Sequence, residues 1–387
     1  MISVTEALDH LFALANPLGH EEVPLIQAAG RVMVQPATAR RDQPPFAASA
    51  MDGYGTQNPH VGQKLQVIGE AAAGHRFDGE IAQGSCIRIF TGAPVPASVT
   101  HVTIQENVTR VGDQITINDI GTGDNIRPAA GDFGIGQTIS APRRLTPNDV
   151  ALLAAMNIPT VTVARQPKVA LISTGDELVM PGENPGPDQI IASNTFGLHA
   201  MLRDLGALPR LLPIARDSEA SLRAVFDLID DAHLVITIGG ASVGDHDLVA
   251  KVAGDLGMDR AFYKVAMRPG KPLMSGRMSD AMMMGLPGNP VSAMVCGHIF
   301  VAPVIRAMQG LGTAPAARLQ CPLAAPIAEN GPREHYMRAE VTQGGLTAFE
   351  RQDSSLLSVL GASNALLVRP PHDPARKTGE LVDYIPL

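Results

Sequence analysis

Cysteine, long apolar runs and an excess of basic charge are all scarce or missing in this 387-residue chain. Its three cysteines, Cys86, Cys296 and Cys321, lie far apart without a C-x-x-C pair, which excludes a disulfide framework and a zinc ribbon. No uninterrupted apolar run reaches the length of a membrane span, and the start carries Glu6 and Asp9 instead of a basic leader, so we expect a cytoplasmic protein that binds no membrane. The net charge of −8 argues against nucleic-acid binding, so any anionic substrate must be bound by local basic groups.

The most informative stretch is Gly239–Asp247, a glycine-rich loop between the apolar run Leu234–Ile238 and a helical pattern that begins at Leu248. A strand, a glycine loop and a helix start together suit a phosphate-like anion, although this loop has neither the Walker A ending nor the G-x-G-x-x-G pattern. Asp245 and Asp247 would repel such an anion unless a divalent cation lay between them. The loop therefore predicts metal-assisted chemistry on a phosphorylated ligand.

The length predicts two to four domains, and the pattern of residues changes along the chain. Ser3–Glu6 is a capping-box pattern followed by apolar residues at helical spacing, which predicts a first helix, and a second helix is expected over residues 23–29. Short β-like runs such as Lys64–Gly69 and Cys86–Phe90 then alternate with Gly/Pro turns to about residue 130. This part reads as a small β-rich domain.

Between residues 168 and 308, short apolar runs alternate with amphipathic patterns, which is typical of βαβ units and a mostly parallel sheet with helices on both faces. The expected strands are Val169–Ile172, Leu211–Ile214, Leu234–Ile238, Phe262–Val265 and Met282–Met284. A helix is expected behind Ser218, where Leu222, Val225 and Phe226 form an apolar stripe. Residues 316–387 are Pro-rich and β-like, which predicts a terminal barrel or sandwich.

Four polar clusters follow strand candidates, and parallel strands would bring all four to one edge of the sheet. These clusters are Thr174–Glu177, Gly239–Asp247, Arg268–Pro272 and Leu286–Ser292. One such cluster is more often only a turn, whereas four at one edge favour a binding site.

The four clusters are chemically complementary. Their carboxylates, on Asp176, Glu177, Asp245 and Asp247, can hold a hard cation through oxygen. Arg268 and Lys271 can neutralise an oxyanion, and Ser292 lies near a predicted helix N-terminus that also favours anions.

Seven motifs, in a fixed order along nearly the whole chain, carry a specific resemblance. They are Ser49–Gly55, Ile89–Ala93, Asn125–Arg127, Ser173–Leu178, Gly239–Asp247, Pro269–Pro272 and Leu286–Ser292. With these motifs the chain resembles the molybdopterin molybdenumtransferase family, which includes the bacterial MoeA proteins and the equivalent domain of gephyrin.

The resemblance implies insertion of molybdate into adenylylated molybdopterin, with Mg²⁺-dependent hydrolysis of its pyrophosphate link and release of AMP. It also implies a multidomain α/β plus β fold. The implied parts are an elongated linker domain (1–44 and 132–166), an inserted β-rich domain (45–131), a central doubly wound, molybdopterin-adenylyltransferase-like α/β domain (167–315) and a C-terminal β-barrel-like domain (316–387). Family members are homodimers whose site lies between the α/β domain of one chain and the inserted domain of the other, and the adenylyltransferase is a further possible partner.

Site residues follow from the same resemblance. The catalytic set is Asp52, Glu177, Asp217, Asp247, Lys264, Arg268 and Lys271. The set that binds the substrate comprises Thr91, Arg127, Thr174, Gly175, Ser193, Asn194, Gly239, Gly240, Ser242, Gly244, Pro287, Gly288, Asn289, Pro290, Ser292 and Arg338, with Ser354 and Ser355 as weaker candidates. The metal set is Asp132, Glu177, Asp245 and Asp247.

Two other functions compete with this interpretation. A molybdopterin adenylyltransferase would share the α/β fold but would not need residues 1–165 or the terminal domain. A binding or scaffold protein, as gephyrin partly is, would have no use for clustered charges that repel one another without a ligand.

Overall fold

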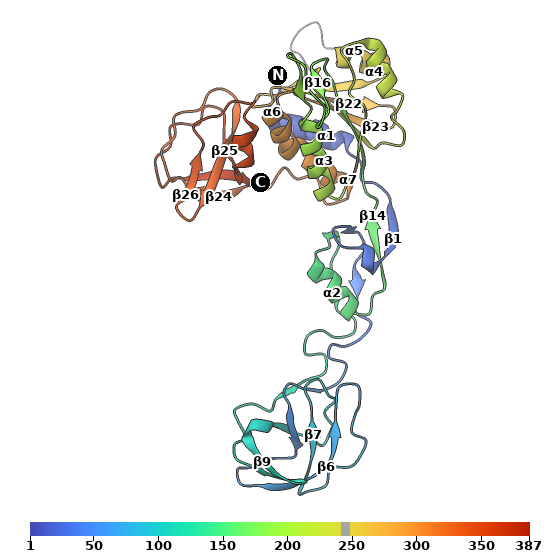
Figure 1. Cartoon of the computed structure of the whole chain (residues 1–387), viewed down its shortest axis with the longest axis vertical. Helices are drawn as coiled ribbons and strands as arrows, with labels where there is room; N and C mark the ends of the chain where they lie inside the picture. Colours follow the sequence, from blue (N-terminus) through green and yellow to red (C-terminus); the bar gives the residue numbers. More distant parts are fainter. Residues whose placement is uncertain (241–247) are drawn as a thin grey trace.

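The computed structural model describes residues 1–240 and 248–387. The molecule is elongated: an α/β domain lies at one end with the C-terminal sheet beside it, and a β-rich domain lies at the opposite end (Figure 1). A small domain that includes α2 (Pro147–Ala155) connects them. The multidomain α/β plus β fold class expected from the sequence is confirmed.

The α/β domain is built on a six-stranded sheet. Its order is β18 (Leu208–Leu211), β15 (Lys168–Ser173), β19 (Leu234–Ile238), β23 (Ala281–Leu286), β22 (Pro272–Met278) and β20 (Asp259–Lys264). The first four strands are parallel, and β22 is antiparallel to both of its neighbours, so β20 runs in the same direction as the first four. The carboxyl ends of β15, β19, β20 and β23 therefore share one edge, where the four polar clusters were expected.

Helices cover both faces of this sheet. One core combines α1 (Val4–Leu14), α3 (Asn194–Asp204), α6 (Pro290–Cys296) and α7 (Ala302–Met308) with Ile236 of β19. The other core combines α4 (Glu219–Phe226) and α5 (Leu248–Asp255) with Val235 of the same strand. Because successive side chains of a strand point to opposite faces, the fully buried strand β19 packs against both layers. This is the doubly wound arrangement that the sequence predicts.

The helical stretch Pro290–Met308 contains α6, the π-helical turn η3 (Gly297–Val301) and α7 in succession. It has 19 residues and a mean hydropathy of 1.7, so by length and composition alone it could span a membrane. It is not an uninterrupted apolar run, because polar residues such as Ser292 and His298 lie within it. Because 78% of its most apolar window is buried inside the protein, the stretch packs as a core helix.

The two helices predicted near the start have different outcomes. α1 begins with the expected capping box, in which Ser3 Oγ accepts from the amide of Glu6 at 3.1 Å and the Glu6 carboxylate accepts from the amide of Ser3 at 2.7 Å. The helix predicted over 23–29 is wrong, since the chain there forms β1 (His20–Pro24) and the short 3₁₀ turn η1 (Leu25–Gln27). β1 pairs along its whole length with β14 (Thr160–Ala164), and this distant pairing outweighs the weak local helix pattern.

The connecting domain combines two segments that are far apart in the sequence. Its sheet has the order β1-β14-β2-β13, with β2 at Val32–Met33 and β13 at Arg143–Arg144, and β3 (Ala37–Thr38) pairs with β12 (Thr138–Ile139). Met33, Phe133 and Leu153 meet in one core. The chain thus leaves this domain, forms the β-rich domain and returns.

The β-rich domain contains a six-stranded sheet. Its order is β8 (His101–Ile104), β5 (Gly53–Thr56), β7 (Ser85–Ile89), β6 (Lys64–Ala71), β10 (Gln114–Ile117) and β9 (Val108–Val111), with the 3₁₀ turn η2 at Gln105–Asn107. A separate pair joins β4 (Ala48–Ser49) to β11 (Ile126–Arg127). The two β-like runs predicted here correspond to β6 and β7.

The C-terminal sheet takes one strand from the α/β segment. Its order is β21 (Met267–Arg268), β25 (Glu334–Thr342), β27 (Ala365–Arg369), β28 (Leu381–Pro386) and β24 (Leu319–Pro322), with β26 (Gly345–Ala348) on β25 and the short helix α8 at Leu357–Gly361. The register places Arg268, His335 and Arg369 side by side on three adjacent strands. The β21–β25 pairing therefore ties the C-terminal sheet to the edge of the α/β sheet.

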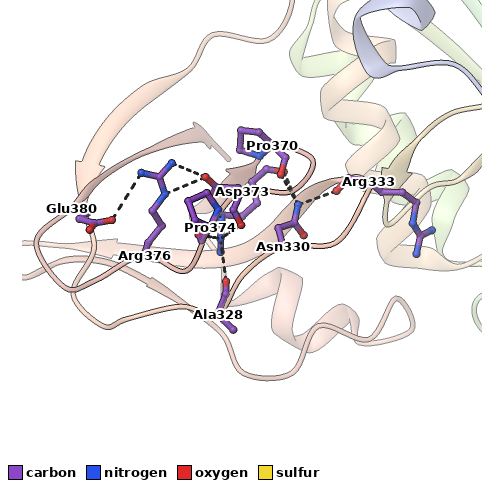
Figure 2. Close-up of polar contacts among 9 residues, drawn as sticks. Ala328, Asn330, Arg333, Pro370, Asp373, Pro374, Arg376 and Glu380 are labelled. Atoms are coloured by element: carbon purple, nitrogen blue, oxygen red, sulfur yellow. Dashed lines mark hydrogen bonds and ion pairs between the residues drawn. The ribbon is translucent and has the colours of Figure 1, made fainter.

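A buried ion network fixes the loops at the end of β27 (Figure 2). Asp373 accepts from both Arg369 and Arg376, and Arg369 also donates to the carbonyls of Ala328 at 3.0 Å and Pro374 at 2.8 Å. Arg369 and Asp373 are 2% and 6% exposed, so the pair is desolvated and its hydrogen bonds hold Arg369 in one orientation.

Candidate active site

The edge of the α/β sheet contains a cleft of about 580 Å³. The strand pair β16 (Leu178–Val179) and β17 (Ile190–Ile191) borders it. Twelve predicted site residues line it: Thr174, Gly175, Glu177, Ser193, Asn194, Asp217, Gly239, Gly240, Pro287, Gly288, Asn289 and Pro290. The structure thus brings together residues from all four polar clusters. The cluster Arg268–Pro272 contributes only Pro272 to the wall of the cleft.

The glycine turn after β19 brings backbone close to the end of β15. Gly239 and Gly240 have φ of 93° and 65°, which side chains rarely adopt. A Cβ on Gly239 would lie 2.6 Å from the carbonyl oxygen of Thr174, and one on Gly240 would lie 2.8 Å from its hydroxyl. That hydroxyl is buried and has no hydrogen-bond partner within residues 1–240 and 248–387. A polar ligand in the cleft would satisfy it.

Among the described residues, two carboxylates line the cleft, on Glu177 and Asp217. The Glu177 carboxylate lies over Gly175, where a Cβ would be 2.4 Å from Oε2, and the φ of 146° at this position favours glycine. Asp176 Oδ1 accepts from the amide of Asp217 at 3.1 Å, which joins the two acidic loops. Arg216 strengthens this junction because it donates to the carbonyls of Asp176 and Leu178, both at 3.0 Å. The sequence analysis missed Arg216, although its place directly before Asp217 was a signal.

The predicted metal set does not assemble within the described part of one chain. In that part no group of three or more His, Cys, Asp or Glu residues is placed to hold a metal ion. Asp245 and Asp247, together with Ser242 and Gly244 of the binding set, lie outside the described residues. Asp132 lies between β11 and β12, where its amide donates to the carbonyl of Gln43 at 2.9 Å, and it is not among the residues that line the cleft.

Magnesium chemistry nevertheless fits the donors in the cleft. Mg²⁺ is usually bound by one or two carboxylates together with phosphate oxygens and water. Glu177 and Asp217 are carboxylates on the wall of a cleft that the glycine turn at Gly239 also lines. A cation that bridges these acids to a phosphorylated ligand is therefore compatible with the residues present.

A buried guanidinium lies beside the cleft. Arg338 of β25 is fully buried, and its Nη2 donates to the carbonyl of Asp353 at 3.0 Å. Its Nε and Nη1 have no hydrogen-bond partner among the residues that the structure describes. Burial, together with the nearby charge of Arg268, lowers the pKa of Arg338. An oxyanion at this point would both satisfy the free N–H groups and balance the charge.

His335 lies between Arg268 and Arg369 on three adjacent strands. It is 7% exposed, and burial, with the charges of Arg268 and three further arginines, lowers its pKa to about 4. The imidazole is therefore neutral at pH 7 and adds no charge of its own.

The other predicted basic residues lie near the same edge of the sheet. Lys264 ends β20, and Lys271 directly precedes Pro272 of the cleft wall. Ser292 is buried in the first turn of α6, where the amide of Val291 donates to the carbonyl of Ser354 at 3.1 Å. Ser355 lines the cleft itself. Lys264, Arg268, Lys271, Ser292 and Arg338 thus lie around the cleft without forming its wall.

Three predicted residues, Asp52, Thr91 and Arg127, lie in the β-rich domain at the opposite end of the molecule (Figure 1). Asp52 Oδ1 accepts from the amide of Thr91 at 2.8 Å and from its hydroxyl at 2.7 Å. These hydrogen bonds hold the pKa of the Asp52 carboxyl below its ordinary value. One chain by itself does not bring this carboxylate to its own cleft.

Comparisons with known proteins agree with this arrangement of domains. Residues 2–157 match the model of the MoeA N-terminal region (domains I and II), residues 170–307 that of a probable molybdopterin binding domain, and residues 320–387 that of the MoeA C-terminal region (domain IV). The chain therefore belongs to the MoeA family and is an enzyme of molybdenum cofactor biosynthesis.

Individual relatives agree with this family. The molybdopterin molybdenumtransferase of Haemophilus influenzae is 37% identical, over 77% of this chain and 75% of the relative, and that of a Nostoc species is 35% identical, over 80% and 75%. The crystal structure of the molybdopterin biosynthesis MoeA protein from Pyrococcus horikoshii OT3 is similar over the full length of both chains, with a TM-score of 0.81 and 26% identity.

Proposed function

We propose that this chain inserts molybdate into adenylylated molybdopterin, hydrolysing the pyrophosphate link and releasing AMP. The observation that carries the proposal is the pairing, at one sheet edge, of an acid-lined cleft that suits a phosphorylated ligand with a buried, unsatisfied guanidinium that suits an oxyanion. The names of its relatives, molybdopterin molybdenumtransferases, support the same chemistry.

The glycine turn and the start of α6 receive the pyrophosphate and nucleotide end. Gly239 and Gly240 allow close approach of the backbone, and the Thr174 hydroxyl offers a hydrogen bond. Asn194 donates to the carbonyl of Gly288 at 2.6 Å and so fixes the loop before α6 that lines the cleft. Ser193 lies on the same wall.

The basic residues beside the cleft bind molybdate. Arg268, Lys271 and Arg338 supply positive charge beside the cleft, and the Ser292 hydroxyl and Lys264 complete the set. Because Arg338 is already desolvated and has two free donor atoms, binding an oxyanion there needs little reorganisation.

The acids hold Mg²⁺, which when bound stabilises negative charge on the pyrophosphate oxygens. Glu177 and Asp217 line the cleft, and Asp245 and Asp247, which lie outside the described residues, are assigned to the same set from the sequence alone. Asp132 does not line the cleft of its own chain, so we assign it to this set from a second chain.

The working enzyme is a homodimer in the cytoplasm. A second chain supplies Asp52, Thr91 and Arg127 to the cleft, since the length of the molecule separates these residues from the cleft of their own chain. The substrate comes from a molybdopterin adenylyltransferase, which is a possible transient partner.

The test is AMP release from adenylylated molybdopterin, measured with and without molybdate across a Mg²⁺ titration. Molybdate- and Mg²⁺-dependent release supports the proposal, whereas release that a chelator does not change contradicts the metal-assisted step. Adenylylation of molybdopterin in place of its consumption would indicate an adenylyltransferase, and no turnover at all would indicate a scaffold.

A further inference from the structure

Arg88 of β7 makes contacts that the site described above does not explain. The strand register places it directly opposite Tyr54 of β5. Its Nη1 donates to the carbonyl of Gly53 at 3.1 Å, and its Nη2 donates to Oε1 of Gln105 at 2.6 Å. The guanidinium carbon lies 5.1 Å from the centroid of the Tyr54 ring and 4.8 Å from that of Phe90. One side chain therefore makes two directed hydrogen bonds and two cation–π contacts.

Three of these four contacts are with residues adjacent to, or bonded to, Asp52 or Thr91. Gly53 follows Asp52 in the chain, and Phe90 precedes Thr91. The amide of Gln105 donates to the carbonyl of Asp52 at 3.0 Å. Arg88 thus touches both turns whose side chains meet in the Asp52–Thr91 hydrogen bonds.

The geometry also fits the charge of Asp52. Its carboxylate accepts twice through Oδ1 from Thr91, and the hydrogen bonds from Thr91, with the positive charge of Arg88 as a smaller cause, hold its pKa below the ordinary value. A side chain that keeps the turns together and adds positive charge favours the ionised, oriented carboxylate.

We propose that Arg88 is a positioning residue, which holds together the turns of Asp52 and Thr91 so that the Asp52 carboxylate is presented in one orientation. This inference rests on the proposed function, in which Asp52 acts in the cleft of a second chain. Lysine cannot replace Arg88 fully, because a single ammonium lacks the planar fork that reaches Gly53 and Gln105 together.

The test compares Arg88→Met and Arg88→Lys with the control Arg110→Met in the full-length protein. Arg110 lies on the same sheet and also interacts with Tyr54, but it donates to the carbonyl of Gly112 at 2.8 Å instead of to Gly53. Hydrogen–deuterium exchange is followed at the amide of Thr91, which donates to Asp52, and Asp52→Ala sets the exchange rate expected when that bond is lost.

We expect Arg88→Met to speed exchange at Thr91 toward the rate of Asp52→Ala, with Arg88→Lys between Met and wild type. Exchange in β10 of the same sheet should stay unchanged in each variant, which separates loss of positioning from loss of the fold. Arg110→Met should leave Thr91 protected. If the amide of Thr91 stays protected from exchange in Arg88→Met, the proposal is overturned. Should Arg88→Met not fold, the same result in Arg88→Lys overturns it.

Activity adds a second measurement. AMP release by Arg88→Met should fall at least about tenfold, mainly in kcat, because misplacing a reacting group weakens the transition state more than substrate binding. Mixed dimers of Arg88→Met with Glu177→Ala should recover activity, and mixed dimers with Asp52→Ala should not. Recovery with both or with neither contradicts a role at Asp52. If even Asp52→Ala and Glu177→Ala fail to complement each other, the shared cleft of the proposed function is wrong, and exchange at Thr91 alone decides the positioning role.

Discussion

A Cβ on Gly270 would lie 2.6 Å from the Sγ of Cys296. Gly270 has a φ of 102° and forms the middle of the loop that carries Arg268 and Lys271, whereas Cys296 is fully buried at the end of α6. The thiol therefore packs directly against the backbone of the basic loop. Burial raises the pKa of Cys296 to about 12, so it acts there as a small neutral side chain.

Gly270→Ala should move this loop. The left-handed φ costs an alanine about 1–2 kcal/mol, and the contact with Cys296 adds a displacement of Arg268 and Lys271. We expect lower thermal stability and a higher KM for molybdate, with partial recovery of the KM in Gly270→Ala/Cys296→Ala. Gly310→Ala is the matched control, because Gly310 has a φ of 77° but nothing within 4 Å of its added Cβ. An equal effect of the two alanines on the KM would contradict a loop that depends on this contact.

Arg338→Met should separate oxyanion binding from folding. Removal of a buried guanidinium with two unsatisfied donor nitrogens should leave the stability unchanged or raise it. Hydrogen bonds to charged groups contribute about 1.5–3 kcal/mol, so molybdate use should fall about ten- to a hundredfold. The measurements are Tm with and without molybdate and molybdate-dependent AMP release, with the ion-paired Arg318→Met as control. A molybdate-induced rise in Tm that survives in Arg338→Met would place the oxyanion elsewhere.

Mixing two inactive chains should restore activity if the cleft is shared. In a dimer of two Asp52→Ala chains, or of two Glu177→Ala chains, both clefts lack one of the two residues. A mixed dimer contains one cleft in which both residues are intact. Co-expression with two affinity tags isolates the mixed dimer, and AMP release is then compared with each parent. Mixed dimers as inactive as the parents would show that Asp52 does not act in the cleft of a second chain.

Amide variants of the cleft acids should test the cation. Glu177→Gln and Asp217→Asn keep shape but remove charge, so substrate binding should persist while pyrophosphate hydrolysis falls by about a hundredfold. Excess Mg²⁺ should partly restore a variant whose defect is metal affinity, and the readout is the rate of AMP release across a Mg²⁺ titration. Full rates in both variants would remove these two residues from the site.

Asp373→Asn should destabilise the C-terminal sheet in a pH-dependent way. Burial by itself raises the pKa of Asp373, but hydrogen bonds from Arg376 and Arg369 outweigh it and hold the pKa below its ordinary value of 3.8. Because the folded-state pKa is the lower one, the stabilisation is present above about pH 3.8 and is lost as the pH falls through the folded-state value. Loss of one partner of this buried pair should cost about 3 kcal/mol at pH 7.

Urea unfolding of wild type and Asp373→Asn at pH 7 and at decreasing pH measures this difference. The exposed Asp113→Asn is the control, since the exposed pair with Arg110 contributes only about 0–1 kcal/mol. A difference for Asp373→Asn that does not shrink in acid would contradict a contribution from the ionised carboxylate.

Much of the α/β domain could be predicted from local patterns. The mostly apolar run at 234–238 forms β19, and Ser218 caps α4, whose Leu222, Val225 and Phe226 are buried as expected. Such features depend on residues within one or two turns of one another, so they are visible in a single sequence. That the polar clusters share one edge of the sheet could also be predicted, because strands that run in the same direction end on the same side.

The pairing partners and the environment of each side chain could not be predicted. Residues 23–27 form β1 and η1 because of distant pairing with β14. The roles of Arg88 and Arg216 depend on which carbonyls lie within reach, and only the packed chain decides this.

By itself the sequence determined which residue types could do the chemistry and, through the order of its motifs, the family to which the chain belongs. Tertiary structure alone decided that Arg338 is buried with free N–H groups, that Cys296 lies under Gly270, and that Asp52 and Glu177 are at opposite ends of one chain. The physical reason is that burial, close contact and separation in space arise from segments far apart in sequence, whereas composition and spacing are local properties.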